Sequence, residues 1–331
     1  MTSPTRMTVA ALGLAATCAW LPGAQAQTWK PTKPVEFSVG AGAGGALDQV
    51  ARTLKNITDQ QSTIPTSLIV NNRPAGGGVV ALSGLKQHAG DAHYLASWSQ
   101  QWLTNYVIGD WKESPTAEYT TLAILFSEYV GLAVRADSPL KNANDLVGRL
   151  KSDPKAASIA VATALGNHIH IGAAKPLLAA GVDVSKLTVV PFKSSAESVT
   201  ALLGGHVDVV AATTANLVGQ LDAGKIRLLA ISSPQRLGGA FAQVPTWKEQ
   251  GIDAEFASMQ GIMAPQGLTP AQHQYWAETL TRATATPEWA AFCQRNQWTP
   301  RLITGPQAQQ FAEAQLAEMR AILRELNLAK Q

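Results

Sequence analysis

The chain has 331 residues, of which 46% are apolar and only 15% are charged, with a formal net charge of +3. This length suggests about two domains, and the apolar content is enough to bury a sizeable core, which excludes a disordered protein. The near balance of 26 Lys and Arg against 23 Asp and Glu disfavours a dedicated nucleic-acid binder. Two cysteines exclude a disulfide scaffold and a cysteine-rich zinc site.

Residues 1–26 have the layout of a secretory signal peptide. One cation, Arg6, precedes an apolar run over 7–21, and the segment ends in the small-x-small signal Ala24-Gln25-Ala26. The run is shorter than the roughly 20 residues that span a bilayer, although an uncleaved anchor remains the alternative. We therefore expect an exported, soluble mature protein, in which Cys293 is the only cysteine and no internal disulfide can form.

Strands and helices alternate over the first two thirds of the mature chain. A strand at Val35–Val39 leads into the glycine-rich turn Gly40–Gly45 and then a helix whose apolar residues share one side. Further strands are predicted at Ser67–Val70, Tyr94–Trp98, Leu122–Leu125, Glu128–Val134, Ser158–Ala162, Leu187–Val190, Val207–Ala211 and Ile226–Ile231. Helices are predicted at Asp48–Ile57, Val79–Gln87, Asn144–Lys151, His168–Ala180, Ser195–Leu203 and Asn216–Ala223. This alternation predicts an α/β fold with parallel sheets covered on both faces.

The last third has a different pattern. After a strand at Gly261–Ala264, three helices are predicted at Pro270–Thr284, Pro287–Asn296 and Pro306–Leu326, each with proline near its N-terminus. The last of them has apolar residues near helical spacing, so we expect it to pack against a sheet.

Two patterns resemble nucleotide-binding motifs. Gly40, Gly42 and Gly45 spell G-x-G-x-x-G after a strand, but the next strand ends in Asn71-Asn72, where a dinucleotide site needs an acid for the ribose. Gly219, Gly224 and Lys225 resemble a phosphate loop, yet they lie between a helix and a strand, the reverse of the order required. We therefore expect no nucleotide cofactor.

Metal-binding and catalytic signatures are equally weak. His168 and His170 open a helix, where residues two apart point to different sides, and no acid or cysteine cluster accompanies them. There is no G-x-S-x-G nucleophile elbow and no Cys–His signature near Cys293. We expect no metal site and no catalytic residues.

Two glycine-containing turns each follow a strand and open a helix. They are Gly42-Ala43-Gly44-Gly45 and Gly166-Asn167-His168. Helix N-termini present unpaired backbone N–H groups and a partial positive charge, and glycine allows an anion to approach the backbone. If each turn lies in a different domain, a small anion can bridge the two; alternatively, both turns only reverse the chain.

A series of short motifs runs along the mature chain. They are Trp29–Val35, Val39–Asp48, Val70–Gly78, Asp91–Tyr94, Gly166–His170, Pro191–Ser194, Leu203–Asp208, Gly224–Ala230, Val244–Thr246 and Gly261–Pro265. In this order they resemble the Bug family of tripartite tricarboxylate transporter (TctC-like) periplasmic binding proteins, and the resemblance runs from Trp29 to about Leu328. The family's V-P-F-x-P-G-G-x-x-D is similar to Val39–Asp48, although Ala41, Gly42 and Ala43 replace its F-x-P.

The resemblance implies a two-lobed type II periplasmic binding protein fold, of the α/β class, with a hinge and an interlobe ligand cleft. Residues 27–127 and 240–331 would form lobe 1, and residues 128–239 would form lobe 2. In the family, a carboxylate is held by the two loops described above, largely through backbone groups and ordered water.

Carried over to this sequence, the resemblance implies the following ligand-binding residues: Ala41, Gly42, Ala43, Gly44, Gly45, Ser97, Trp98, Ser99, Gln100, Gly166, Asn167, His168, His170, Ser194, Ser195, Asp208, Thr213 and Thr214. We expect Asp48 to brace its loop rather than touch the ligand, because like charges repel. Trp98 and Trp102 could stack on an aromatic acid, although burial as core residues is the favoured interpretation.

The implied function is that of a periplasmic solute-binding protein, not an enzyme. It would act as a monomer and capture a small carboxylate, aromatic or dicarboxylic, for the membrane subunits of a tripartite tricarboxylate-type transporter. No cofactor and no nucleic acid are expected. The alternatives are a secreted α/β enzyme, since fold does not fix function, and a ligand-sensing subunit of a signalling system.

Overall fold

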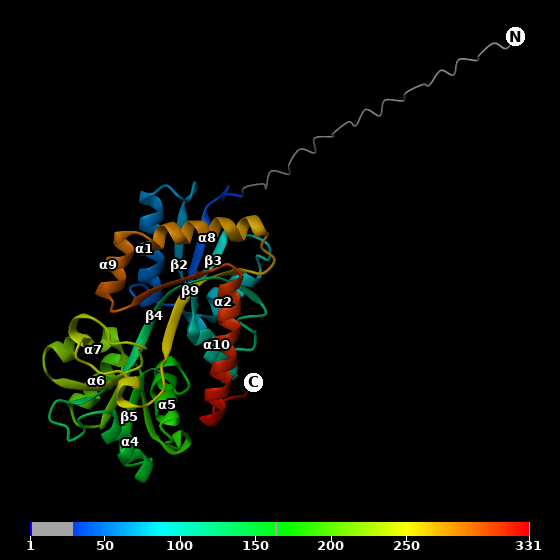
Figure 1. Cartoon of the computed structure of the whole chain (residues 1–331). Helices are drawn as coiled ribbons and strands as arrows, with labels where there is room; N and C mark the ends of the chain where they lie inside the picture. Colours follow the sequence, from blue (N-terminus) through cyan, green and yellow to red (C-terminus); the bar gives the residue numbers. More distant parts are fainter. Residues whose placement is uncertain (2–28, 163, 331) are drawn as a thin grey trace.

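The computed structural model describes Met1 and residues 29–162 and 164–330, so the signal peptide predicted over 1–26 lies, apart from Met1, outside the described residues. Within them the molecule has two lobes, each built on a β-sheet covered by helices (Figure 1). The expected two-lobed α/β architecture is thus confirmed.

The sheet of the first lobe has the strand order β2-β1-β3-β9-β4-β10. Its strands are β1 (Val35–Val39), β2 (Leu68–Asn72), β3 (Tyr94–Ser99), β9 (Ala257–Pro265), β10 (Thr299–Thr304) and the first part of β4 (Tyr119–Arg135). The helices of this lobe are α1 (Ala46–Gln60), η1 (Ala75–Gly78), α2 (Val79–Lys86), α3 (Gln100–Val107), α8 (Pro270–Thr284), α9 (Pro287–Arg295) and α10 (Pro306–Glu325).

The sheet of the second lobe has the order β6-β5-β7-β4-β8. Its strands are β5 (Ser158–Ala162), β6 (Thr188–Phe192), β7 (Val209–Thr213), β8 (Ile226–Ile231) and the last part of β4. The helices are α4 (Ala143–Ser152), α5 (His168–Ala179), η2 (Val184–Lys186), α6 (Ser195–Leu203), α7 (Thr214–Asp222), η3 (Gly239–Phe241) and η4 (Lys248–Gln250).

Strand β4 belongs to both sheets, which differs from the two separate strands predicted at 122–125 and 128–134. It pairs with β9 up to Tyr129 and with β7 and β8 from Val130 onward. Because β4 and β9 run between the lobes, they enter the sheets antiparallel to their neighbours, so both sheets are mixed rather than parallel as predicted.

The chain returns to the first lobe between Ser232 and Ala257. The Ser232 hydroxyl accepts a hydrogen bond from the backbone N–H of Val130 and donates one to the carbonyl of Phe256, so it ties both crossings together. The boundary predicted from the sequence, after residue 239, puts residues 240–256 in lobe 1. In the structure this segment contacts the second lobe, since the Gln250 side chain accepts a hydrogen bond from the N–H of Ala143 and donates one to the carbonyl of Leu229. The first boundary, after residue 127, lies next to the point where β4 changes sheets.

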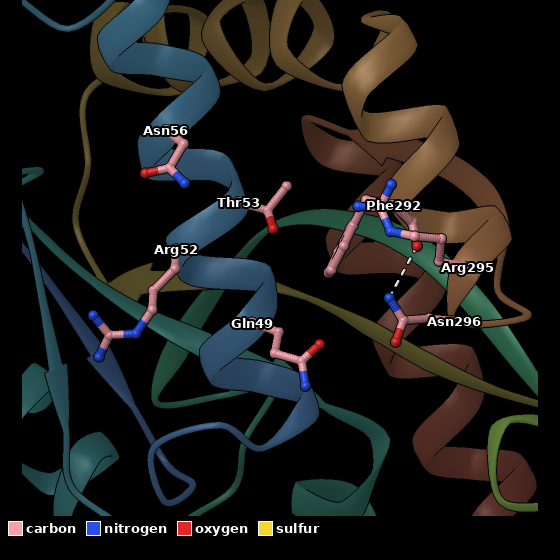
Figure 2. A pocket seen from close by; sticks show the side chains of 7 residues that line it. All are labelled: Gln49, Arg52, Thr53, Asn56, Phe292, Arg295 and Asn296. Carbon is pink, nitrogen blue, oxygen red and sulfur yellow. Dashed lines mark hydrogen bonds between the residues drawn. The ribbon is translucent and has the colours of Figure 1, made fainter.

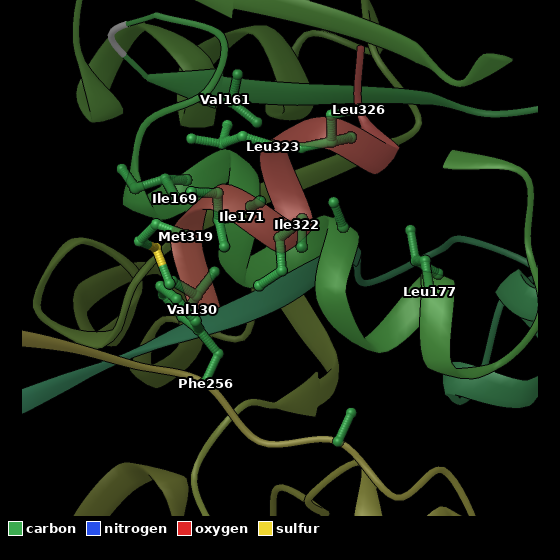
Figure 3. Close-up of a cluster of buried hydrophobic side chains, with 14 of the residues drawn as sticks. Val130, Val161, Ile169, Ile171, Leu177, Phe256, Met319, Ile322, Leu323 and Leu326 are labelled. Atoms are coloured by element: carbon green, nitrogen blue, oxygen red, sulfur yellow. The ribbon is translucent and has the colours of Figure 1, made fainter. Parts of the chain in front are cut away.

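The C-terminal half of α10 packs against α5 of the second lobe. Met319, Ile322, Leu323 and Leu326 meet the side chains of α5 and of the crossing strands in one buried cluster (Figure 3). The cores of the two lobes are therefore continuous along this side of the molecule, as expected for a final helix with a regular apolar face.

Candidate functional site

The predicted binding loops follow the carboxyl ends of parallel strands. In the first lobe β1 and β3 are parallel neighbours, and in the second lobe β5 lies parallel to β6 and β7. Ligands of open α/β sheets bind outside these ends, where loops and helix N-termini converge. The two predicted loops therefore lie at the edge of each sheet where such ligands would bind.

The loop between β1 and α1 is braced by Asp48, as expected. The buried Asp48 carboxylate accepts hydrogen bonds from the backbone N–H of Gly44 (2.8 Å), from Arg52 Nε (3.0 Å) and from Asn72 Nδ2 (2.9 Å). Asn72 also donates to the carbonyl of Ala41. These donors lower the pKa of Asp48, although burial opposes them most strongly. Gly42, Ala43 and Gly44 remain exposed at the tip of the loop.

The loop between β5 and α5 is braced by its own polar side chains. Asn167 caps α5 by accepting hydrogen bonds from the N–H groups of Ile169 and His170, and it donates to the carbonyl of Ala162. The N–H of Gly166 donates to Nδ1 of the buried His170 at 2.9 Å. Asn167 and His170 therefore shape this turn, and the Gly166 N–H is already used.

A row of polar side chains lies on one face of the first lobe's sheet where the strands leave its core. Ser99 of β3 is paired with Gln260 of β9, and Glu128 of β4 is paired with Ser258 of β9. Side chains of paired residues, and of residues two apart, share one face of a sheet. We call Ser97, Ser99, Glu128, Ser258 and Gln260 the polar strip; each is at least nine-tenths buried.

The polar strip connects the two predicted binding loops. At one end, the N–H of Gly40, just before the first loop, donates to Ser97 Oγ at 3.2 Å. At the other end, Nε2 of His168, the first residue of α5, lies 3.9 Å from Oε1 of Glu128. Between them Gln260 Nε2 donates to Glu128 Oε1 at 3.2 Å. Residues from both lobes thus meet on one polar surface.

Burial shifts the ionisation of the groups at this surface. It raises the pKa of Glu128 to about 7, against the opposing effect of the nearby Gln260, Ser258 and Trp298. It lowers the pKa of both His168 and His170 to about 4, so both imidazoles are neutral at neutral pH. Shifted carboxyl and imidazole groups that lie together are typical of functional sites.

Several buried polar atoms at this surface have no hydrogen bond to any described residue. They are Ser258 Oγ, Gln260 Oε1, His168 Nδ1 and Nε1 of Trp298, whose ring stacks on Phe126. Buried polar groups are nearly always satisfied in folded proteins, so a concentration of unused ones indicates a place where a polar ligand or water binds.

Two predicted site residues point away from the strip. Trp98 lies between Ser97 and Ser99 on β3, so its side chain faces the opposite side of the sheet, where it is fully buried in the core. Gln100 is also fully buried and bonds to Gln315 of α10 and to the N–H of Met259. Trp102 packs against Trp111, and both Trp98 and Trp102 are core residues, as favoured from the sequence.

The remaining predicted residues divide between the two edges of the second sheet. Ser194 and Ser195 start α6 and Thr213 and Thr214 start α7, so they lie at the edge of the binding loops. Asp208 precedes β7 and accepts hydrogen bonds from Ser158 at the start of β5, at the opposite edge. Its carboxylate therefore holds two strand starts together, away from the loops.

Two pockets lie elsewhere on the described part of the molecule. One, of about 390 Å³, lies between α1 and α9 and includes Arg52, Arg295 and Asn296 (Figure 2). Gln49, which lines it, donates to the carbonyl of Gly44 in the first loop. The other, of about 260 Å³, lies between the strand crossings and α10, and includes Tyr129 and Phe311. Neither was predicted from the sequence.

Sequence reasoning also missed Glu128, Ser258, Gln260 and Trp298. A signal was available for the first three, because each is a polar residue inside a strand that is mostly apolar and buried on both faces. Trp298 is brought to the strip only by the turn that follows α9, and no local pattern indicates that placement.

Within the described ranges, no group of three or more His, Cys, Asp or Glu side chains is placed to hold a metal ion. No described helix is both long enough and apolar enough to cross a bilayer.

Comparisons with proteins of known structure support the two-lobed fold described above. Solved structures superpose on nearly the whole chain: a TctC solute-binding protein from Polaromonas has a TM-score of 0.77 at 22% identity, covering 89% of this chain and 99% of that one. A Rhodopseudomonas palustris protein with adipate (TM-score 0.72, 22% identity, 90% and 99%) and MatC of the same species with bound malate (0.69, 22%, 88% and 99%) are also similar. The class of fold is that of periplasmic solute-binding proteins.

The family follows from the sequence comparisons. The model of the family described as "Tripartite tricarboxylate transporter family receptor" matches residues 50–328. The UPF0065 protein in the gbd 5′ region of Cupriavidus necator is 30% identical over 322 residues, which cover 97% of this chain and 94% of the relative. BugT of Bordetella pertussis is 28% identical over 254 residues, covering 72% and 73%. The chain belongs to the tripartite tricarboxylate transporter receptor (TctC) family of periplasmic solute-binding proteins.

Proposed function

We propose that this protein captures a small carboxylate between its lobes in the periplasm and delivers it to the membrane subunits of a tripartite transporter. The observation that carries the proposal is the polar strip, which joins the loop at 41–45 of the first lobe to the loop at 166–170 of the second. Membership of the receptor family and the signal-peptide pattern of residues 1–26 support the export and the partner.

The ligand carboxylate would be held by backbone N–H groups rather than by a cation. The exposed tip at Gly42 and Ala43 and the N-terminus of α1 offer such donors, and a helix N-terminus carries a partial positive charge. Related structures hold adipate and malate, which supports a carboxylate as ligand class. The proposed role is binding without a chemical step, so the ligand should be recovered unchanged.

The test is isothermal titration of the mature chain with a panel of aliphatic, aromatic and amino carboxylates, guided by mass spectrometry of any ligand that co-purifies. Gly45→Leu is the informative variant, because a Cβ at this position already lies 3.1 Å from the carbonyl of Gly42 and displaces the loop. We expect at least a tenfold loss of affinity with the fold retained.

Gly238→Leu is the matched control. It also adds a leucine side chain at a glycine with negative φ, but an added Cβ there has no neighbour within 4 Å among the described atoms and the residue lies far from the loops in sequence. Affinity unchanged in Gly45→Leu, or reduced equally in both variants, would contradict a role of the first loop in binding.

A further inference from the structure

Glu128 is a buried carboxylate on the strand that crosses between the lobes. Only 11% of its side chain is exposed. Among the described residues, His168 is the one basic side chain within 4 Å, and burial keeps its imidazole neutral near pH 7. An ionised carboxylate buried without a cation is costly, which is why such charges are usually paired.

The groups around Glu128 include a buried hydrogen-bond acceptor that no described donor uses. Gln260 gives one N–H to the Glu128 carboxylate and leaves its own Oε1 without a hydrogen bond to any described residue. The hydroxyl of Ser258, directly opposite Glu128 on β9, is also unused within the described part of the chain. The Nε1–H of Trp298 also faces the carboxylate, but neither it nor Gln260 carries a charge. An ammonium group has three N–H donors, no acceptor and a positive charge, so it would pair the buried carboxylate and supply a donor to Gln260 Oε1.

The position of Glu128 relative to the binding loops fixes which end of a ligand would reach it. His168, which approaches Glu128, directly follows the Gly166-Asn167 turn and is the first residue of α5. Glu128 therefore lies at the second loop's end of the polar strip, and a ligand whose carboxylate is held at the first loop, at the opposite end, extends along the strip toward Glu128. A second carboxylate at that end would face a carboxylate of the protein, and like charges in a buried site repel.

We propose that Glu128, together with Gln260 Oε1, binds a protonated amine of the solute, so that the ligand class is a zwitterionic amino carboxylate. The inference rests on the proposed function, because the first loop must hold the carboxylate at the other end of the strip. Ser258 accepts the third N–H or orients a bridging water.

The experiment measures affinities by isothermal titration with matched compounds at each chain length from three to six carbons. At each length the probes are the α-amino acid, the ω-amino carboxylate, the α,ω-dicarboxylate and the unsubstituted monocarboxylate. For the length that binds best, we expect one of the amino compounds to bind at least tenfold more tightly than the dicarboxylate. Glu128→Gln should remove this preference and change the affinity for the monocarboxylate less than threefold.

Glu255→Gln is the control, because Glu255 lies on the second crossing segment with about half of its side chain exposed and faces Lys248. It should keep the wild-type preference. A wild-type preference for dicarboxylates, or an unchanged ratio in a folded Glu128→Gln protein, would overturn the inference and leave the carboxylate-binding function standing. Absence of binding to every probe in the wild-type protein would overturn both.

Discussion

Thr214 of the second lobe donates a hydrogen bond from its hydroxyl to the carbonyl oxygen of Gln297 of the first lobe at 3.2 Å. Thr214 is fully buried at the start of α7, and Gln297 follows α9 in a backbone conformation with φ of 57°. This contact lies on the same side of the molecule as the polar strip, because the next residue, Trp298, lies close to Glu128. On the α10 side, Lys175 and Glu318 form an ion pair that also joins the lobes.

The first prediction concerns this contact. Thr214→Val removes the hydroxyl but keeps the shape of the side chain, and it leaves the Gln297 carbonyl without this donor. We expect the arrangement of the lobes seen in the structure to lose about 1 kcal/mol of stability, which is the usual net value of one hydrogen bond. Small-angle scattering of the ligand-free protein should show a larger radius of gyration than the wild-type protein shows.

Thr200→Val is the control for this change, because Thr200 is exposed on α6 and its hydroxyl bonds only within its own helix. It should leave the radius of gyration unchanged. Equal radii in Thr214→Val and the wild-type protein would show that this hydrogen bond does not hold the lobes together.

The second prediction concerns Asp48. Asp48→Ala leaves the Gly44 N–H and Asn72 without their acceptor and should lower the free energy of unfolding by about 2 kcal/mol, since hydrogen bonds to a charged group are worth more than neutral ones. Because the folded-state pKa of Asp48 is lowered, this contribution is present above the unfolded-state pKa and lost as pH falls through the folded value. Chemical denaturation at pH 7 and at acidic pH measures both effects.

Asp59→Ala on the same helix is the control, because Asp59 forms only an exposed ion pair with Lys55. Such pairs contribute at most about 0.5 kcal/mol. If both substitutions cost the same, the network around Asp48 would not be what stabilises the first loop.

The third prediction concerns the close approach of β9 and β4. A Cβ on Gly261 would lie 2.0 Å from the carbonyl oxygen of Ala123, and neither backbone can move without breaking the sheet. Gly261→Ala should therefore lower the free energy of unfolding by about 3 kcal/mol or more. Gly219 lies in α7, and an added Cβ there would have no described neighbour within 4 Å outside its own helix. Gly219→Ala should therefore be neutral or stabilising, because alanine favours the helical conformation more than glycine does. Thermal denaturation compares the two, and a mild Gly261→Ala would mean that the strands can separate locally.

The sequence predicted the elements whose signals are local. Pro270 and Pro287 near helix N-termini, the capping Asn167 and the apolar spacing of Val50, Leu54 and Ile57 all correspond to helices in the structure. The loops at 41–45 and 166–170 were found because glycine at a strand end leaves a pattern in the chain itself.

What the sequence could not supply depends on pairing between distant segments. From the sequence, Trp98 is as good a candidate for ligand binding as its neighbours Ser97 and Ser99. Only the pairing of β3 with β9 shows which face of the sheet carries the two serines and which carries Trp98. Glu128 and Gln260 are 132 residues apart and become neighbours only because β4 and β9 both cross between the lobes. Asp208 belongs to a family motif in the sequence, yet its place just before β7 puts it at the edge of the sheet opposite the two predicted loops.

The last prediction concerns the pH dependence that Glu128 gives to stability. Its pKa is about 7 in the folded protein and 4.5 by default, so between these values the folded state holds a proton that the unfolded state has lost. Stability from this group therefore falls as pH rises from 4.5 to 7, by about 3 kcal/mol at roughly 1.4 kcal/mol per unit.

Glu128→Gln lacks this titration, so its stability relative to the wild-type protein should increase over the same range. His168 and His170, whose lowered pKa values act in the opposite direction, are present in both proteins and cancel in the difference. Urea denaturation at intervals from pH 4.5 to 8 measures the difference in free energy of unfolding between Glu128→Gln and the wild-type protein, with the distant Glu278→Gln as control. If this difference does not change with pH, Glu128 is ionised in the ligand-free protein.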